Sequence, residues 1–360
     1  MQPFVYNALP SRVIFGSGTI ARLKSEIERA GCRRALLLST PEQADVLGEI
    51  AASLGSLAAG TFTQAAMHTP TDVTERALSK VQECKADCTV SFGGGSSTGL
   101  GKAIALRTDL TQIAVPTTYA GSEVTPIIGE TKDGVKVTQR TLKVLPEIVI
   151  YDVDFTLSLP QRLTVTSGTN AIAHAVEALY AEDRNPVISM MAEQAISAMG
   201  RALPAIVEDP NAREARAEAL YGAWLCGVCL GSVGMALHHK LCHVIGGAFD
   251  LPHADTHTVI LPYAMAYNAK AAPEADRTVA RALGNADGTS ALVALSKKLG
   301  SPQSLKSLGM PESGIDRAAD LAVQNPYWNP RPIERDAIRR LIAAAWAGDP
   351  PAALNEKYGT

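Results

Sequence analysis

The sequence lacks the features of a membrane protein or a nucleic-acid-binding protein. It has no run of about 18 apolar residues, the length that a membrane-spanning helix needs. Its 33 Lys and Arg are balanced by 36 Asp and Glu, and it has no basic stretch that would attract nucleic acid or an anionic bilayer. The N-terminus "MQPFVYNALPSRVIFG" has neither the basic start nor the apolar core of a signal peptide. We therefore expect a cytoplasmic protein with no membrane and no nucleic-acid partner.

The sequence also lacks the cysteine pattern of a zinc or redox site. Cys226 and Cys229 form a CxxC pair, but no second CxxC accompanies it. The flanking residues are Leu and Val, and "AEALYGAWLCGVCLGSVGMAL" has the pattern of a long buried helix. We interpret these two cysteines, and Cys84 with Cys88, as reduced structural thiols.

The two halves of the chain differ in pattern. With 360 residues, 46% of them hydrophobic, the chain is long enough for two domains with separate cores. Short buried strands alternate with helices in the first half, and from about residue 160 the pattern is helical nearly throughout. The sequence predicts a Rossmann-like α/β domain with a parallel sheet over residues 1–158, and an all-α domain over residues 159–360. The clearest strands are "RRALLLST", "ADCTVSFGGGS", "TQIAVPTT" and "EIVIYD".

A glycine-rich turn follows one of these strands. In "CTVSFGGGSSTGLGKAIAL" the strand runs through three glycines, which end at Gly95, and into a helix. Glycines allow a close approach of ligand to backbone, and a helix N-terminus attracts a diphosphate. The spacing is neither GxGxxG nor a Walker loop, so a tight turn without a ligand is the alternative. A second strand end, "VPTTYAGSEVT", would place Thr117, Thr118 and Ser122 at the same edge of the sheet.

Six of the seven histidines lie between residues 174 and 257. In "GTNAIAHAVEALYA" the helical spacing places Asn170, His174 and Glu177 on one face. His239 and His243 are likewise four residues apart, on a helix that we expect to end at Gly246 and Gly247. We expect the following histidines to lie in a loop (His253) and at the start of the next element (His257). Such a cluster is either a metal or proton-donor site or a set of satisfied core residues.

These motifs together resemble the iron-dependent alcohol dehydrogenase family of the dehydroquinate synthase-like superfamily. The resemblance covers essentially the whole chain. It is closest to the maleylacetate reductases, which carry "GGGSSTGLGKAIAL", "TYAGSEVTP", "ALYGAWLCG", "GMALHHKLCH" and "NPYWNPRP" nearly as they stand here.

The resemblance implies a metal site that has lost one ligand. Metal-dependent relatives hold iron or zinc through an aspartate and three histidines, which fall on Asn170, His174, His239 and His253. A neutral amide is a poor ligand for a divalent cation, although three histidines can still hold zinc, so the departure weakens the site without abolishing it. We therefore predict that no metal is bound. A metal-dependent alcohol dehydrogenase is the alternative, and a nucleotide-binding protein without catalysis is a third possibility.

The resemblance also implies NADH or NADPH as the cofactor. Thr40 stands where relatives carry the acidic residue that binds the adenosine ribose, so a 2′-phosphate would be tolerated. Gly99 replaces an aspartate that follows the glycine turn in relatives. The predicted cofactor-binding residues are Thr40, Gly94, Gly95, Ser96, Thr117, Thr118, Ser122 and Lys136.

The implied reaction is the reduction of a conjugated double bond in a dianionic keto acid. It needs a stabilised oxyanion and one proton, and an imidazole can supply both. We predict His243 as the first catalytic candidate and His253 as the second, with His174 and His239 completing a polar wall. Asn170, Lys240 and Tyr119 are the predicted substrate contacts, and Arg140 and Arg331 are weaker candidates. We also expect a homodimer, and closure of the two domains before hydride transfer.

Overall fold

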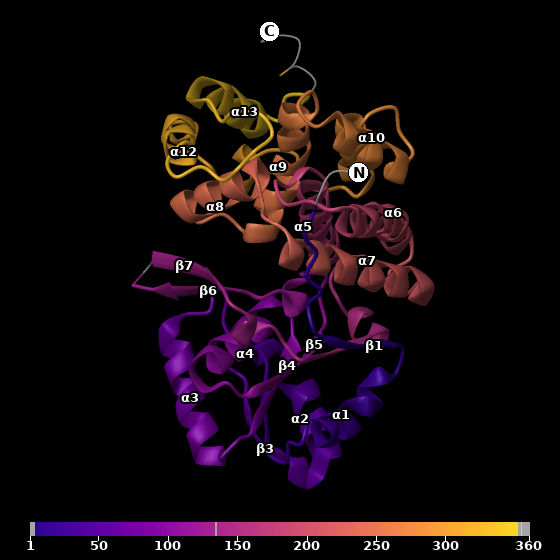
Figure 1. The fold of residues 1–360 in the computed structure, drawn as a ribbon, viewed down its shortest axis with the longest axis vertical. Coiled ribbons are helices and arrows are strands. Elements are labelled where there is room, and N and C mark those ends of the chain that lie inside the picture. Colours follow the sequence, from indigo (N-terminus) through magenta and orange to yellow (C-terminus); the bar gives the residue numbers. More distant parts are fainter. Residues whose placement is uncertain (1–3, 134, 352–353, 355–360) are drawn as a thin grey trace. The chain divides into compact units, whose positions relative to one another are not determined.

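The structure is a computed structural model that describes residues 4–133, 135–351 and 354. It divides into two compact units, shown as ribbons in Figure 1. One is an α/β unit, Ala8–Leu159. The other is a helical unit, Pro160–Thr360, with which Met1–Asn7 is grouped. The predicted fold class, an α/β domain followed by an all-α domain, is confirmed.

The α/β unit is built on a sheet of six strands in the order β1-β8-β5-β4-β2-β3, and every neighbouring pair is parallel. β2, β4 and β8 are buried along their whole length, as continuous apolar strands of a parallel sheet should be. The strands are β1 (Arg12–Gly16), β2 (Ala35–Leu38), β3 (Ala58–Phe62), β4 (Cys88–Gly93), β5 (Thr111–Pro116) and β8 (Ile148–Asp152).

Helices cover both faces of this sheet. α1 (Leu23–Arg29) and α2 (Ala44–Leu54) pack on one face, in a core that includes Ile113 and Ile150. α3 (Thr71–Cys84) and α4 (Gly95–Thr108) pack on the other face against Leu36 and Leu38. The carboxyl ends of β2, β4 and β5 are adjacent, because β4 pairs with both of the others. Ligands bind at such strand ends in open α/β sheets.

An antiparallel hairpin, β6 (Ile127–Lys132) and β7 (Val135–Arg140), stands outside this sheet. The buried Lys102 on α4 holds the chain that leads into it, since its Nζ donates to the carbonyls of Ser122, Thr125 and Ile127 at 2.6–2.8 Å. Burial lowers the pKa of Lys102 to about 7. The carbonyls and the Thr125 hydroxyl supply the acceptors that a buried lysine requires.

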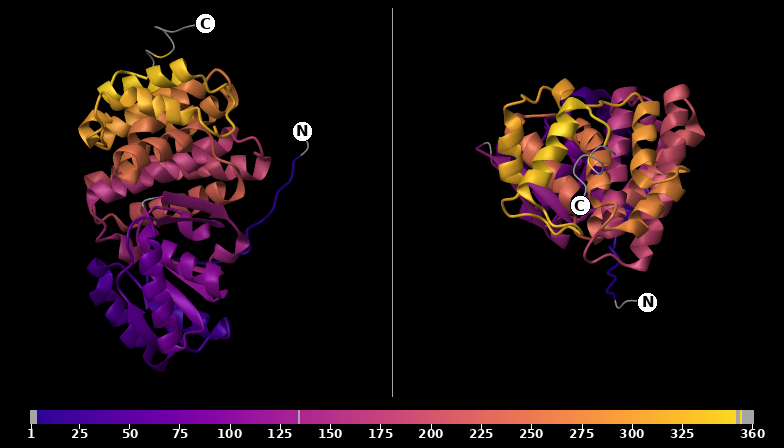
Figure 2. Two further views of the ribbon diagram at one scale, coloured as in Figure 1. Left: turned by 90° about the vertical axis from the view of Figure 1, so that its left-hand side faces the viewer. Right: turned by 90° about the horizontal axis from the view of Figure 1, so that it is seen from above.

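The helical unit is organised around α5, which is buried on nearly all sides. α5, α6 and α7 pack side by side, and glycines allow the close approach: a Cβ on Gly222 of α7 would lie 2.8 Å from Met199 of α6. A second core joins α8, α9, α12 and α13. Figure 2 shows these helices from two further directions. The helices are α5 (Gln161–Tyr180), α6 (Pro186–Glu208), α7 (Arg213–Ser232), α8 (Leu237–Phe249), α9 (His253–Asn268), α10 (Pro273–Leu283), α11 (Gly288–Lys298), α12 (Gly314–Ala322) and α13 (Arg335–Ala347).

Two predicted helix boundaries were wrong. α8 continues through Gly246 and Gly247 to Phe249, and it ends where Asp250 takes a left-handed conformation with φ of 51°. His253 is not in a loop, because α9 begins at that residue with Pro252 as its N-cap. His257 therefore lies one turn inside α9 instead of at the start of an element.

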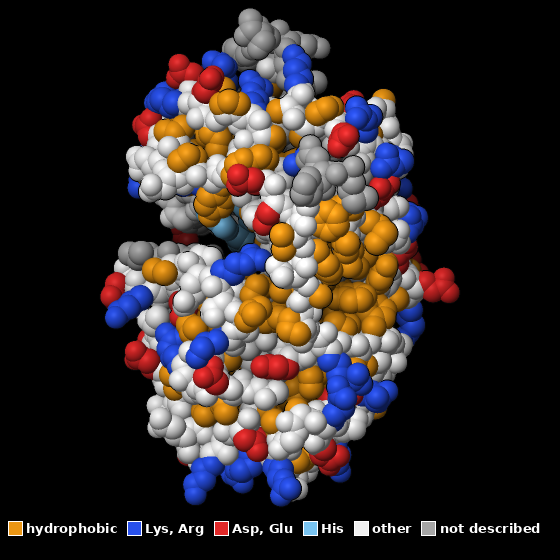
Figure 3. Space-filling model, viewed as in Figure 1, with side chains coloured by type: hydrophobic (Ala, Val, Ile, Leu, Met, Phe, Trp, Pro, Cys, Tyr) orange, Lys and Arg blue, Asp and Glu red, His pale blue; other side chains and the backbone are white. Residues whose placement is uncertain are grey.

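Among the described residues, no single helix combines the length and apolarity that a membrane crossing requires; only α7 and α8 taken together, bent by 95° at their junction, meet those criteria. Acidic and basic side chains are interspersed on the face drawn in Figure 3. The mixed surface agrees with a formal net charge of −3.

Candidate active site

Six histidines gather in the helical unit. α5 carries His174, α8 carries His238, His239 and His243, and α9 carries His253 and His257. Ring centroids lie 5.1 Å apart for His174 and His239, and 6.2 Å apart for His243 and His253. The four histidines predicted to be catalytic are thus in one cluster, and His257 lies beside three of them, at 4.3–6.4 Å from His253, His239 and His243.

Exposure divides the cluster into an inner and an outer part. His174, His238, His239 and His257 are at least 96% buried, His253 is half-buried and His243 is exposed. Burial, together with the neighbouring imidazoles, lowers the pKa of His174, His238 and His257 well below the usual value. These three rings are therefore neutral near pH 7. A proton delivered to a substrate would come from the outer part of the cluster.

A buried carboxylate anchors the inner part. Glu177, on α5, is 0% exposed and accepts three hydrogen bonds from the start of α8. The donors are the backbone N–H groups of Ala236 (2.9 Å) and His238 (2.7 Å), and Nδ1 of His239 (2.6 Å). Nε2 of His239 remains buried without a hydrogen-bond partner among the described residues.

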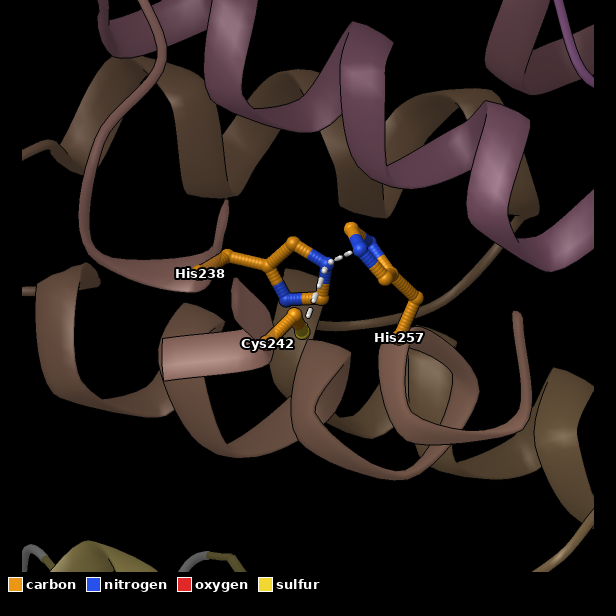
Figure 4. A group of neighbouring side chains, drawn as sticks. All are labelled: His238, Cys242 and His257. Carbon is orange, nitrogen blue, oxygen red and sulfur yellow. Dashed lines mark hydrogen bonds between the residues drawn. The ribbon is translucent and has the colours of Figure 1, made fainter. Parts of the chain in front are cut away.

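The inner histidines also include a compact group of His238, Cys242 and His257, drawn in Figure 4. The two rings point toward each other, with Nε2 of His238 3.0 Å from Nδ1 of His257. The Cys242 sulfur lies 3.7 Å from the same Nε2. Burial raises the pKa of the Cys242 thiol, so it stays protonated and acts as a weak hydrogen-bond partner. This group joins α8 to α9.

The outer histidine His243 meets the loop between α12 and α13. Its Nδ1 lies 3.2 Å from the hydroxyl of Tyr327. Nearby, Lys240 donates from Nζ to the carbonyl of Gln324 at 2.7 Å, and its ammonium lies 5.8 Å from the Tyr327 ring. Partial burial lowers the pKa of Lys240. An ammonium has three donors, so the bond to Gln324 leaves Lys240 able to bind a carboxylate.

Arg331, a weaker candidate for carboxylate binding, is engaged in the same loop. Its guanidinium stacks 4.1 Å from the Tyr267 ring centroid and donates to the Tyr267 carbonyl at 3.2 Å. Asn329 fastens this loop to α9 through a reciprocal pair of amide bonds with Asn268 at 2.8–2.9 Å. Arg331 therefore serves the packing of the loop. Arg140, the other weak candidate, lies in β7 of the α/β unit.

The positions that hold the metal in metal-dependent relatives are Asn170, His174, His239 and His253. Asn170 contributes an amide where those relatives have a carboxylate, and its Oδ1 has no partner among the described residues. Within the described part of the chain, metal-ligating atoms come within 4.8 Å of one another in two groups of three, and the set of His174, His239 and His253 is not one of them. An amide is a weaker ligand for a divalent cation than a carboxylate, although three histidines can still hold zinc. The atoms without a partner among the described residues also suit a polar ligand that brings its own hydrogen-bonding groups.

The α/β unit contains the predicted phosphate cradle. β4 ends at Gly93, whose φ of 136° is disfavoured for other residues. α4 begins at Gly95, with Gly94 as its N-cap and Ser96 in its first turn. A Cβ on Gly94 would lie 2.9 Å from Thr118, whereas Gly95 faces open space. The backbone N–H groups at the start of α4 can therefore donate hydrogen bonds to a diphosphate.

The second strand end lies beside this cradle, as predicted. The N–H of Thr117 donates to the carbonyl of Gly93 at 3.0 Å, and Gln43 donates to the Thr117 hydroxyl at 2.9 Å. Ser122 opens a short 3-10 helix, and its hydroxyl has no partner among the described residues. Tyr119 is fully buried, and its role as a substrate contact stays a prediction. Lys136 lies in β7, and its side chain is outside the part of the chain that is described.

Thr40 lies just past the carboxyl end of β2, where an adenosine ribose would bind. A hydrogen bond from Thr40 lowers the pKa of the Glu42 carboxyl, which is exposed and charged near neutral pH. A negative charge is thus present at this strand end even though Thr40 is neutral. The prediction of cofactor-binding residues from the sequence included Thr40 but not the charged Glu42.

Gly99, which replaces the relatives' aspartate, is crowded by the chain before α3. A Cβ at Gly99 would overlap the Thr69 hydroxyl. His68 and Thr69 both have positive φ, 65° and 48°, which is strained for non-glycine residues. The backbone N–H of Thr131 in β6 donates to the Thr69 carbonyl at 3.2 Å and holds this conformation.

The sequence did not predict a role for two residues that contact the histidine cluster, Glu177 and Tyr327. Glu177 was placed on the same helix face as Asn170 and His174, but its hydrogen bonds to α8 join residues about 60 positions apart, which the helical pattern does not reveal. Tyr327 stands in "NPYWNPRP", where the motif itself was the available signal.

Comparison with known proteins agrees with this geometry. Residues 10–153 match the family described as iron-containing alcohol dehydrogenase, and residues 164–346 match its C-terminal domain. The chain is 55% identical to the maleylacetate reductase of a Rhizobium species, over 98% of this chain and 100% of that one. It is also 55% identical to the maleylacetate reductase of Sphingobium indicum, over 97% and 99% of the two chains. Among solved structures, it is similar to the maleylacetate reductase of Agrobacterium tumefaciens, with a TM-score of 0.95 and 54% identity over 98% and 100% of the two chains.

These similarities span both units of the fold, and the relatives are covered over nearly their whole length. The prediction of an oxidoreductase is confirmed. The chain belongs to the iron-containing alcohol dehydrogenase family.

Proposed function

We propose that this enzyme reduces the carbon–carbon double bond of maleylacetate to give 3-oxoadipate, with NADH or NADPH as the reductant, in the degradation of aromatic compounds. The observation that carries the proposal is the histidine cluster with Asn170 in place of a carboxylate, in a chain 55% identical to maleylacetate reductases. Such a site offers proton donors and hydrogen bonds without a strong Lewis acid.

The substrate has a double bond conjugated to a ketone. NADH, held by the α/β unit, would supply a hydride; its addition to the β-carbon of this enone would move the electron pair onto the ketone oxygen as an enolate. One proton, added to the α-carbon, completes the reduction. The protein must therefore stabilise one oxyanion and deliver one proton.

His243 is the first candidate for the proton donor. Its side chain is exposed, and its Nδ1 lies 3.2 Å from the hydroxyl of Tyr327. His253, half-buried and stacked 6.2 Å from His243, is the second candidate. His174 and His239 would contribute ring nitrogens to the inner wall, and Asn170 its amide oxygen, all without a partner among the described residues. A substrate can supply the hydrogen bonds that these buried atoms lack.

The substrate is a dianion, so its two carboxylates require cationic or N–H partners. Lys240 is the nearest cation to the cluster along α8, and two of its three donors remain after the bond to Gln324. Tyr119 is retained as a further substrate contact. These assignments are the part of the proposal that a substrate complex would test directly.

The cofactor is assigned to the α/β unit. The backbone of Gly94, Gly95 and Ser96 would hold the diphosphate at the start of α4. Thr117, Thr118, Ser122 and Lys136 would line the nicotinamide side, and Thr40 the adenosine ribose. The reaction would follow closure of the two units around bound cofactor and substrate, which excludes water from the enolate.

The proposed enzyme works without a metal ion, because position 170 lacks the anionic ligand. We further propose a cytoplasmic homodimer that binds neither membranes nor nucleic acid. A metal-dependent alcohol dehydrogenase is the competing function, which family membership alone would support.

One experiment tests the proposal. Oxidation of NADH by the purified protein would be followed with maleylacetate and, separately, with primary alcohols and aldehydes plus added zinc or iron. The proposal expects rapid turnover with maleylacetate that survives chelator. Turnover with alcohols or aldehydes that requires metal, and none with maleylacetate, would refute it.

A further inference from the structure

Glu177 is a buried carboxylate that is hydrogen-bonded to the histidine cluster, and three of its hydrogen bonds come from the start of α8. It lies on α5 three residues after His174, and it is fully buried. Its Oε1 accepts from the His238 N–H, and its Oε2 accepts from the Ala236 N–H and from Nδ1 of His239.

Two of these bonds cap helix α8 from outside. Ala236 is the N-cap residue of α8 and has no side chain that could accept from the first turn. The Glu177 carboxylate accepts from these N–H groups instead, at the end of the helix where a negative charge is stabilised. A cap alone would account for two of the three hydrogen bonds.

The third bond sets the state of an imidazole. His239 must carry a proton on Nδ1 to donate to Glu177 at 2.6 Å. This bond directs Nε2 to the opposite side of the ring from Glu177, and the ring cannot turn without breaking the bond. Nε2 of His239 has no partner among the described residues, and its ring faces His174 at a centroid distance of 5.1 Å.

We propose that Glu177 is a positioning residue for the reduction: it fixes the tautomer and orientation of His239, so that Nε2 faces the bound substrate. This inference rests on the proposed function for the identity of the substrate, and on the three hydrogen bonds for the role of Glu177. The carboxylate acts through His239 and does not touch the substrate.

Glu177→Leu separates positioning from packing, because the apolar side chain fills nearly the same volume. It removes both carboxylate oxygens, so Nδ1 of His239 loses its acceptor and the ring is no longer held. The expected result is a fall in kcat of about 10- to 100-fold, the range seen when a residue that orients an active-site imidazole is lost. NADH affinity should stay unchanged.

Two readouts distinguish this role from helix capping. Nitrogen-15 NMR of histidine-labelled protein should show the His239 proton on Nδ1 in the wild type and no longer fixed there in Glu177→Leu. The effect on kcat should vanish in a His239→Ala background. As a matched control, Asn185→Ala removes another buried N-cap, the 3.1 Å bond to the Ile188 N–H that starts α6. It should lower the melting temperature without changing the turnover of the folded enzyme.

Equal turnover of Glu177→Leu and wild type would overturn the proposal, as would an equal fall in kcat with and without His239. If Glu177→Leu does not fold, Glu177→Asp retains the charge and withdraws the carboxylate by one methylene, and the same comparisons apply to it. If the wild type fails to reduce maleylacetate, the proposed function is wrong. The NMR experiment still tests the tautomer, and an Nε2 proton in the wild type would overturn the positioning role.

Discussion

The division of the histidine cluster into exposed and buried rings predicts opposite effects for two alanine substitutions. His243 is exposed and His257 is fully buried, yet their ring centroids lie only 6.4 Å apart. His243→Ala should lower kcat by about 10²- to 10³-fold, the usual loss for one proton or oxyanion donor. That loss corresponds to a barrier increase of about 3–4 kcal/mol. Its effect on the free energy of unfolding should stay within about 0.5 kcal/mol, as for other surface positions.

His257→Ala should instead destabilise the fold. It removes the 3.0 Å bond to His238, and it leaves a cavity between α8 and α9. An unsatisfied buried nitrogen costs about 1–3 kcal/mol, and the cavity adds to it. We expect a total of about 3–5 kcal/mol, and the melting temperature should fall by about 2–4 °C for each kcal/mol.

Stopped-flow turnover, NADH titration and thermal melts on both variants form the assay. Tyr327→Phe is the control for His243→Ala, since it removes only the hydroxyl that lies 3.2 Å from Nδ1. Its kcat should fall less than that of His243→Ala. Near-normal turnover of folded His243→Ala would refute the reasoning, and the same test on His253→Ala would then show whether His253 is the donor.

Three further predictions concern metal, coenzyme and cradle. The purified protein should contain no stoichiometric iron or zinc and should keep its activity in the presence of a chelator. In a metal titration, Asn170→Asp should bind zinc more tightly than the wild type. The prediction is contradicted if the wild type contains about one metal ion per chain and needs it for turnover. Thr40→Asp should raise KM for NADPH by about 10- to 100-fold relative to KM for NADH, as expected for like charges about 6 Å apart near a protein surface. If the wild type shows no turnover with NADPH, another residue already excludes the 2′-phosphate, and Glu42 is the candidate. Gly94→Ala should raise KM for NADH, because its Cβ would lie 2.9 Å from Thr118 and would displace the backbone that binds the diphosphate. An unchanged KM would remove Gly94 from the cradle.

The parts of the fold that could be predicted are those whose signal lies within a few residues. β2 reads Ala-Leu-Leu-Leu and is entirely buried, so its apolar run identified it. β3 reads Ala-Ala-Gly-Thr-Phe, a sequence of weak strand propensity that only pairing with β2 makes a strand. The hairpin of β6 and β7 is rich in polar residues and likewise passed unnoticed.

The errors around the histidines have the same physical cause. Gly246 and Gly247 favour a helix end by about 1 kcal/mol each, but the packing of α8 in its core outweighs that preference. Pro252 suggested a loop, although a proline just before a helix is compatible with its start. The spacing of four residues predicted which histidines share a face. It could not predict which of them meet Glu177 or Tyr327, because those contacts cross between elements.

The metal-dependent relatives carry an aspartate where this chain has Asn170 and another where it has Gly99. Because Thr69 crowds Gly99, an aspartate is harder to accommodate at position 99 than at position 170. At position 170 a change from amide to carboxylate exchanges one NH₂ group for oxygen within the same volume, so the substitution needs no movement of the backbone. At position 99 any side chain would overlap the Thr69 hydroxyl, and the Thr69 backbone is strained and held by a hydrogen bond from β6. An aspartate at position 99 therefore requires Thr69 to turn its side chain or to be replaced as well. One substitution introduces a carboxylate on α5, whereas the α/β unit must adjust a second residue to accept one on α4.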